Sequence, residues 1–264
     1  MNANDSASGI SLAGMRAVVS AGAAGIGRSI SETLIGAGAR VAVFDVSPDA
    51  VAAMKAANPE IVASVADVSD RPGVDAFFER AFDAFGGLDV LVNNAGIAGP
   101  TARVEDIDPV EWETTIAINL TGQFYCARKA VPALKASPNG SIVNIASVAG
   151  RLGYANRTPY AASKWAIVGF TKSLAIEMGP DGVRVNAILP GIVEGPRMDA
   201  VIQARADATG ATFDETRDDY MGKISLRRMV SMSDVANLAL FLCSPAGRNI
   251  SGQALSVCGN VESL

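Results

Sequence analysis

The chain has 264 residues, 49% of them hydrophobic and 19% charged, which is enough for one large domain or two small ones with a substantial buried core. Its formal net charge of −5 argues against a nucleic acid as the main partner. It contains no histidine, which excludes histidine-based acid–base catalysis and most zinc sites, and we expect no metal centre.

The termini and the cysteines indicate where the protein works. Cys126, Cys243 and Cys258 have no C-x-x-C spacing and are typical of reduced thiols in a cytoplasmic protein. The N-terminal sequence MNANDSASGISLAG lacks the basic region and apolar core of a signal peptide. No apolar run approaches the ~18 residues of a membrane span, so we expect no membrane partner. We expect residues 1–10 to form a flexible arm and residues 11–264 a single domain.

Apolar segments rich in β-branched residues alternate along the chain with longer segments of helical periodicity. In chain order, the expected strands span residues 16–21, 40–46, 61–68, 88–96, 140–147, 183–191 and 253–259. The expected helices span about 28–38, 48–57, 72–86, 109–136, 158–178 and 233–243. Strands this apolar are covered on both faces. The pattern therefore predicts an α/β fold, a single-domain Rossmann-type doubly wound parallel sheet of about seven strands with helices on both faces.

The stretch SAGAAGIGRS, residues 20–29, is rich in glycine but matches neither the G-x-G-x-x-G dinucleotide fingerprint nor a P-loop. Its position is more informative, because it follows the first strand and opens the first helix, where free backbone N–H groups bind phosphate. A tight turn without a ligand is the alternative interpretation. The second strand favours a nucleotide, because it ends in Asp45, 18 residues after Gly27. That is near the ~20-residue interval at which an acidic side chain contacts the adenosine ribose.

These features resemble the short-chain dehydrogenase/reductase family over about residues 12–260. The family loop T-G-x-x-x-G-x-G corresponds here to SAGAAGIG, with Ala21 where the family has its first glycine. Asp67-Val68 resembles the pair that meets the adenine ring, and N-N-A-G at 93–96 resembles the element that ends the fourth strand along the cofactor. The resemblance implies cofactor contacts from Ser20, Gly22, Ala24, Gly25, Ile26, Gly27, Asp45, Asp67, Val68, Asn93, Ala95, Gly96, Tyr160, Lys164, Pro190, Gly191 and Val193.

The sequence YAASK places Tyr160 and Lys164 four residues apart, which puts them on one face of a helix. Such a pair is common by chance, but here Ser147 ends the preceding strand and Asn119 lies on the helix before that strand. In this order, behind the glycine-rich loop, the four residues resemble the catalytic group of the family. The resemblance implies that Lys164 holds the nicotinamide ribose. It also implies that Asn119 holds a water that links Lys164 to solvent.

These residue types suit the oxidation of an alcohol, which requires removal of the hydroxyl proton while a hydride leaves the carbon. In a chain without histidine, the Tyr160 phenol can accept that proton if nearby cations favour its phenolate form. The Lys164 ammonium and the positive nicotinamide both do so. Ser147 is expected to hydrogen-bond the substrate oxygen and to stabilise its developing charge. Hydride transfer belongs to the cofactor.

We expect the cofactor to be NAD rather than NADP. Asp45 is placed to accept a hydrogen bond from a free ribose 2′-hydroxyl, and it would repel a 2′-phosphate. Ala23 and Ala24 in the loop, and Val46 after Asp45, offer no cation to hold such a phosphate.

The substrate is less well determined. We expect the loop after Ser147 and a lid at about 192–230 to form the pocket, with Arg151, Arg157 and Arg197 as candidate substrate contacts. Surface arginines are an equally good interpretation. The polar lid favours a small polar secondary alcohol, such as a sugar, polyol or hydroxy acid. The alternatives are an alicyclic or steroid-like alcohol or dihydrodiol, a non-catalytic NAD(H) sensor, and a lyase or epimerase that uses the cofactor transiently.

The resemblance also implies a homotetramer that uses the long helices around 109–136 and 158–178 and the C-terminal strand. In the family a threonine commonly lies four residues after the position of Gly191, where this chain has Gly195. We expect backbone contacts of Val193 to replace part of the lost cofactor anchoring. We also expect residues 195–226 to form a mobile helical lid that orders when substrate binds.

Overall fold

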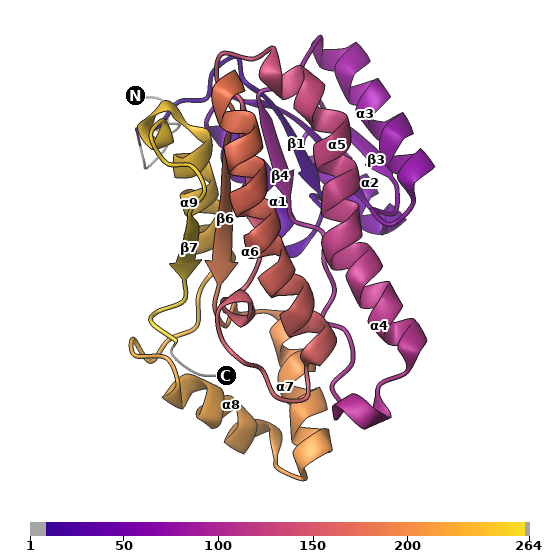
Figure 1. The fold of residues 1–264 in the computed structure, drawn as a ribbon, viewed down its shortest axis with the longest axis vertical. Helices are drawn as coiled ribbons and strands as arrows, with labels where there is room; N and C mark the ends of the chain where they lie inside the picture. Colours follow the sequence, from indigo (N-terminus) through magenta and orange to yellow (C-terminus); the bar gives the residue numbers. More distant parts are fainter. Residues whose placement is uncertain (1–8, 262–264) are drawn as a thin grey trace.

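The structure is a computed structural model that describes residues 9–261, and its centre is one sheet of seven parallel strands (Figure 1). The strand order is β3-β2-β1-β4-β5-β6-β7, with every neighbouring pair parallel. The strands are β1 Arg16–Ser20, β2 Arg40–Asp45, β3 Val62–Val65, β4 Val90–Asn93, β5 Ser141–Ile145, β6 Arg184–Pro190 and β7 Ala254–Val257. The order reverses direction at β1, which confirms the doubly wound sheet that the sequence predicted.

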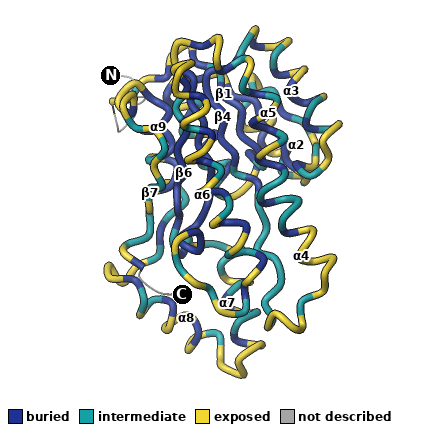
Figure 2. The backbone as a smooth tube through the Cα atoms, in the orientation of Figure 1, coloured by how far each residue is buried: buried dark blue, intermediate teal, exposed yellow. Residues whose placement is uncertain are grey.

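Helices cover both faces of this sheet, because successive residues of each strand point to opposite sides. In β1, Ala17 and Val19 belong to one buried cluster and Val18 to the other. The first cluster includes residues of α1 Gly25–Gly36, α2 Pro48–Ala57 and α9 Met232–Cys243. The second includes residues of α3 Arg71–Phe85, α5 Gly122–Lys135 and α6 Thr158–Met178. Figure 2 shows the strands as the buried centre between these helices.

One predicted helix differs in its geometry. The sequence predicted a single helix over 109–136, whereas the structure has α4 Pro109–Ile116 and α5 joined by a π-helical segment, Ala117–Thr121. The wider π turn places Asn119 fully inside the protein. Such π segments are often found at functional sites, and the periodicity of apolar residues does not distinguish them from α-helix.

The segment 192–230 lies beyond the carboxyl ends of the strands and contains α7 Pro196–Thr209 and α8 Phe213–Gly222 (Figure 1). It has its own small apolar cluster, in which Ile202 and Tyr220 pack with Ile192 and Ile224. A bridge between Val193 and Val230 ties the two ends of the segment together. The predicted helices of this segment are therefore present, and their movement stays a prediction.

The ends of the chain fall mostly outside the described part. The predicted arm, residues 1–10, lies outside the described residues except for Gly9 and Ile10, and Ile10 packs against the main core. None of the helices in the described range 9–261 has the length and apolar character needed to cross a membrane.

Candidate active site

The glycine-rich loop between β1 and α1 is fixed by hydrogen bonds to the segment after β4. Ser20 Oγ accepts hydrogen bonds from the backbone N–H groups of Asn94, at 3.0 Å, and Ala95, at 3.1 Å. Asn94 Nδ2 donates to the carbonyl oxygens of Ser20, at 3.2 Å, and Ala21, at 3.0 Å. Ala21 has φ 47°, the left-handed conformation that a glycine adopts more easily. The loop therefore keeps its turn despite the alanine, with Asn94 holding the neighbouring carbonyls.

The N-terminus of α1 offers free backbone N–H groups at the carboxyl end of the sheet. Its N-cap, Ala24, makes no side-chain cap hydrogen bond, and the first turn contains no acidic residue. Gly25 has φ 53°, and a Cβ there would meet no atom within 4 Å, so space is open beside the helix end. A Cβ on Gly27 would overlap the carbonyl oxygen of Ala21. Unpaired N–H groups at a helix N-terminus fit the pyrophosphate of a dinucleotide.

Gly22 has a different reason to be glycine. A Cβ at this position would lie 2.7 Å from Val43 Cγ1 on β2, so Gly22 allows the loop to pack on the sheet. It does not line the cavity that the neighbouring residues form. The structure thus gives Gly22 a packing role, and its predicted cofactor contact finds no support in the cavity wall.

Asp45 ends β2 beside this loop and lines the same cavity. The residue is 7% exposed. Its carboxylate accepts hydrogen bonds from the N–H groups of Ala23, at 3.3 Å, and Ser47, at 3.1 Å. Within residues 9–261 it forms no ion pair, and Arg28 pairs with Glu32 instead. The carboxylate is therefore available to a hydroxyl donor beside the loop.

Besides Gly22, six predicted cofactor residues do not line the cavity: Ser20, Gly27, Asp67, Val68, Asn93 and Ala95. Asp67 accepts hydrogen bonds from Ser69, and Val68 is buried against Gly122. Asn93 Nδ2 donates to Asn144 Oδ1 at 2.9 Å and so joins β4 to β5. Ala95 is buried in the core. Asn94 lies in the same N-N-A-G element and lines the cavity instead of Asn93. The sequence pattern of strand and turn does not show which of these two adjacent asparagines faces the cavity.

One cavity of about 410 Å³ connects these parts along the carboxyl ends of the strands. It is lined by the loop residues Ala24, Gly25 and Ile26, by Asp45 and Gly96, by Ser147, Tyr160 and Lys164, and by Pro190, Gly191 and Val193. Residues of α7 and α8 close its other side. The structure therefore brings the predicted cofactor loop and the predicted catalytic residues to one site.

Tyr160 and Lys164 project from α6 next to the end of β5. Lys164 Nζ lies 5.6 Å from the centre of the Tyr160 ring and donates a hydrogen bond of 3.0 Å to the carbonyl oxygen of Ile145. Ser147 follows β5, and its Oγ accepts a hydrogen bond of 3.1 Å from the N–H of Ala149. Because that oxygen is used as an acceptor, the Ser147 proton is free to be donated to a ligand.

Asn119 holds the backbone beneath Lys164. Its Oδ1 accepts from the N–H of Ile97 at 2.7 Å, and its Nδ2 donates to the Ile97 carbonyl at 3.1 Å and to Ser163 Oγ at 3.0 Å. A Cβ on Gly96 would lie 3.2 Å from Asn119 Oδ1 and 3.4 Å from Lys164 Nζ. These contacts leave one lone pair of Oδ1 for a water. The contact between Asn119 and a water stays a prediction.

The electrostatics of Lys164 follow from its position. Burial, and secondarily the positive charge of Arg197, lower the pKa of Lys164 from 10.5 to about 7. The ammonium is favoured when a negative group, such as a tyrosine phenolate, forms nearby. The cation that the sequence assigned to Lys164 is thus only partly present at neutral pH in the cofactor-free protein.

The three candidate substrate arginines have different positions. Arg157 and Arg197 line the cavity. Arg151 points elsewhere, because its guanidinium donates to Ser256 Oγ at 3.1 Å and to the Ala254 carbonyl at 2.7 Å on β7. Arg151 does not line the cavity, and its predicted substrate contact finds no support in the cavity wall.

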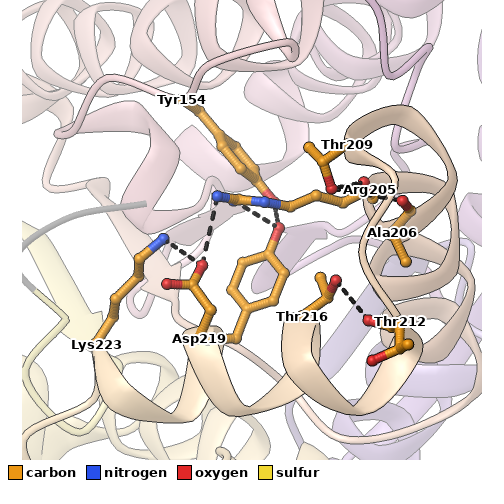
Figure 3. A network of polar contacts seen from close by, with 9 residues as sticks. Tyr154, Arg205, Ala206, Thr209, Thr212, Thr216, Asp219 and Lys223 are labelled. Atoms are coloured by element: carbon orange, nitrogen blue, oxygen red, sulfur yellow. Dashed lines mark hydrogen bonds and ion pairs between the residues drawn. The ribbon is translucent and has the colours of Figure 1, made fainter.

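A polar network that the sequence did not reveal connects the lid to the cavity (Figure 3). The hydroxyls of Tyr154 and Tyr220 are 2.6 Å apart, and Arg205 Nη1 donates to Tyr220 at 3.3 Å. Asp219 pairs with Arg205 at 3.4 Å and with Lys223 at 2.9 Å. Burial, and secondarily Tyr220, raise the pKa of Tyr154, so this hydroxyl stays protonated. The network holds α7 and α8 against the loop that follows Ser147.

Comparison with known proteins identifies the family of the chain. A family model described as enoyl-(acyl carrier protein) reductase matches residues 21–260. Trans-4-hydroxycyclohexanecarboxylate dehydrogenase of Sinomonas cyclohexanicum is 36% identical over 253 residues, which cover 92% of this chain and 91% of the relative.

Two solved structures share the fold. NAD+-bound xylitol dehydrogenase has a TM-score of 0.90 at 26% identity, covering 94% of this chain and 99% of the other. An actinorhodin polyketide ketoreductase with NADPH has a TM-score of 0.89 at 32% identity, covering 93% and 96%. Together with the doubly wound sheet and the cavity at its carboxyl edge, these matches show that the chain belongs to the short-chain dehydrogenase/reductase family of oxidoreductases.

Proposed function

We propose that the protein is an NAD(H)-dependent dehydrogenase that interconverts a secondary alcohol and a ketone, with Tyr160 as the general acid/base. The observation that carries this proposal is the single cavity that joins the N-terminus of α1 and Asp45 to Ser147, Tyr160 and Lys164. A dinucleotide with its pyrophosphate at the N-terminus of α1 could extend along this edge to Tyr160, because both line the same cavity.

The chain's own residues supply binding and proton transfer. NAD, when bound, accepts the hydride from the carbinol carbon. The Tyr160 oxygen takes the hydroxyl proton during oxidation and returns it during reduction. The Ser147 hydroxyl donates to the substrate oxygen and stabilises its charge. Lys164 lies over the Tyr160 ring, and its protonated ammonium stabilises the phenolate. Asn119 hydrogen-bonds the backbone N–H and carbonyl of Ile97.

Asp45 supports NAD rather than NADP as the cofactor. Its buried carboxylate faces the cavity, and the loop beside it contributes backbone N–H groups and no cation. A 2′-hydroxyl could donate to this carboxylate, whereas a 2′-phosphate would place negative charge against it. The contacts proposed for Val193 and for the loop residues belong to the same cofactor pose.

For the substrate, we propose a small polar alcohol, with a sugar, polyol or hydroxy acid as the classes to test. Arg157, Arg197 and the Tyr154–Tyr220 pair supply the polar part of the wall. A second candidate, an alicyclic alcohol, is favoured by the apolar part of the wall, where Met198, Val201 and Met232 lie.

The assembly and location stay proposals as well. Trp112, Phe124, Trp165 and Ile176 are exposed on α4, α5 and α6. Exposed large apolar groups of this kind support association between copies, as in the homotetramer that we propose. The cysteines Cys126, Cys243 and Cys258 are free thiols, which supports a cytoplasmic location.

A substrate screen tests the function. Purified protein is incubated with NAD or NADP and a panel of sugars, polyols, hydroxy acids and alicyclic alcohols, and the absorbance of the reduced cofactor is followed. We expect reduction of NAD with at least one member of the panel, and kcat/KM higher for NAD than for NADP. Binding of NADH without turnover of any member would favour a sensor. Substrate turnover without net NADH would favour a lyase or epimerase.

A further inference from the structure

Arg157 is a buried cation in the wall of the proposed active site. The residue is 3% exposed and lines the cavity at the N-terminus of α6. Its Nη2 donates a hydrogen bond of 2.7 Å to the Ala98 carbonyl. Its Nε is shielded from solvent and has no hydrogen-bond partner within residues 9–261. A guanidinium carries five N–H donors in a planar fork, so this side chain retains donor capacity inside the protein.

The charge of Arg157 also lacks an acidic partner. Among the ion pairs of the described residues, none includes Arg157. Two acidic residues line the cavity, and neither pairs with it: Asp45 ends β2 and Glu194 follows β6. Burial of an unpaired charge is costly, and an incoming anion would offset that cost.

Two aromatic rings hold the guanidinium beside the proposed acid/base. Arg157 Cζ lies 5.2 Å from the centre of the Tyr154 ring and 5.1 Å from the centre of the Tyr160 ring. Cation–π contacts at these distances fix the group without using its N–H donors. An anionic group on Arg157 would therefore belong to the same small molecule whose hydroxyl faces Tyr160.

The same cavity is also lined by a second cation and by apolar side chains. Arg197, in the first turn of α7, donates a hydrogen bond of 3.0 Å to the Gly96 carbonyl and lines the same cavity. Met198 and Val201, from the same helix, and Met232 add apolar surface. Planar donors beside apolar side chains suit an organic carboxylate, because the arginine fork matches the two oxygens and the methyl and methylene groups cover the carbon skeleton.

We propose that Arg157, assisted by Arg197, binds the carboxylate of a small hydroxy acid, so that the substrate is a secondary alcohol carrying a carboxylate. This inference rests on the dehydrogenase function proposed above. The carboxylate itself is only bound and does not react. In the oxidation, the hydride passes from the carbinol carbon to NAD+, the hydroxyl proton passes to Tyr160, and the oxo acid is the product.

The test measures binding of unreactive probes by calorimetry with the protein saturated with NADH. The probes are cyclohexanecarboxylate and butyrate, each compared with its neutral amide. We expect at least one carboxylate to bind the wild type about tenfold or more tightly than its amide. R157Q should weaken carboxylate binding by about 10- to 100-fold, the range of a hydrogen-bonded ion pair. The control R217Q removes an equal charge from an exposed position on α8 and should leave carboxylate binding unchanged.

Retention of NADH binding by R157Q verifies that the variant folds. R157K keeps the positive charge but lacks the planar fork, so its affinity for the carboxylate should lie between those of the wild type and R157Q. If R157Q does not fold, two measurements still test the proposal. These are the affinities of the wild type for carboxylate and amide, and the affinity of R157K for the carboxylate. The proposal would be overturned if the wild type bound carboxylate and amide equally, or if R157Q bound the carboxylate as tightly as the wild type. Binding of inorganic phosphate but of neither carboxylate probe would also overturn it. Reduction of NAD by neutral alcohols, without binding of either carboxylate, would reject the carboxylate site at Arg157 but not the dehydrogenase function. Carboxylate binding through Arg157 with no alcohol oxidised would reject the dehydrogenase alone.

Discussion

Lys164 should destabilise the cofactor-free protein at neutral pH, and Lys164→Met should relieve this cost. Burial, with a smaller effect of Arg197, lowers the pKa of Lys164 from 10.5 to about 7. A difference of about 3.5 pH units corresponds to about 5 kcal/mol at ~1.4 kcal/mol per unit. The substitution also removes the hydrogen bond to the Ile145 carbonyl, which contributes about 1.5–3 kcal/mol. We therefore expect the free energy of unfolding of K164M to be about 2–3.5 kcal/mol higher than that of the wild type at pH 7.

The lowered pKa of Lys164 makes the stability of the wild type depend on pH. Between about pH 7 and 10.5, the unfolded wild type holds a proton on Lys164 that the folded state has lost. Wild-type stability therefore rises with pH in this window, by about 1.4 kcal/mol per unit from this group. This contribution of Lys164 to stability is fully present above its unfolded-state pKa of 10.5 and is lost as the pH falls through about 7. The advantage of K164M should shrink accordingly as the pH increases.

Urea unfolding of the cofactor-free protein at pH 7, 8 and 9, at one protein concentration, measures this difference directly. K55M provides the control, because Lys55 is exposed on α2 and its substitution should give a difference that does not change with pH. A difference between K164M and wild type that stays constant with pH would refute the reasoning. So would a K164M protein that is less stable than the wild type at pH 7.

Three further outcomes follow from the same geometry. D45A should narrow the ratio of kcat/KM for NAD over NADP, and equal ratios in wild type and variant would contradict the assigned role of this carboxylate. G27A should weaken NADH binding about tenfold or more in a fluorescence titration, because its Cβ would overlap the Ala21 carbonyl, whereas G36A on the same helix has open space and should bind normally. Residues 195–226 should exchange amide hydrogens more slowly when NAD and a substrate are bound, and identical exchange in both states would remove the lid.

Much of the fold was predictable because its main signal is local. The strands are continuous apolar runs, and alternation with helices leaves few topologies for a parallel sheet. The expected strand 88–96 ends at Asn93 in the structure, because the following residues leave the ladder to bind Ser20. The π segment around Asn119 depends on tertiary contacts with Ile97 and Ser163, which no periodicity records.

That Ser147, Tyr160 and Lys164 lie in one cavity was predictable from their order and spacing, but the side chains that line the proposed substrate side of the cavity were not. Arg151 and Arg157 lie in the same loop and have the same chemistry, yet one bonds β7 and the other lines the cavity. The path of the loop backbone sets the direction of each arginine side chain, and the amino-acid composition of the loop does not reveal that path. Likewise, the Tyr154–Tyr220 pair joins segments 66 residues apart, a contact that has no local sequence pattern.

The most direct test of the account is the kcat of Tyr160→Phe with NAD and a substrate found in the screen, measured together with NADH binding. The substitution removes only the phenolic oxygen and keeps the ring contacts with Arg157 and Lys164 possible. We expect NADH to bind with nearly unchanged affinity and kcat to fall by about 10²–10⁴-fold, the range for loss of a general acid/base. Near-normal kcat in the variant would contradict the assignment of Tyr160 as the group that moves the proton.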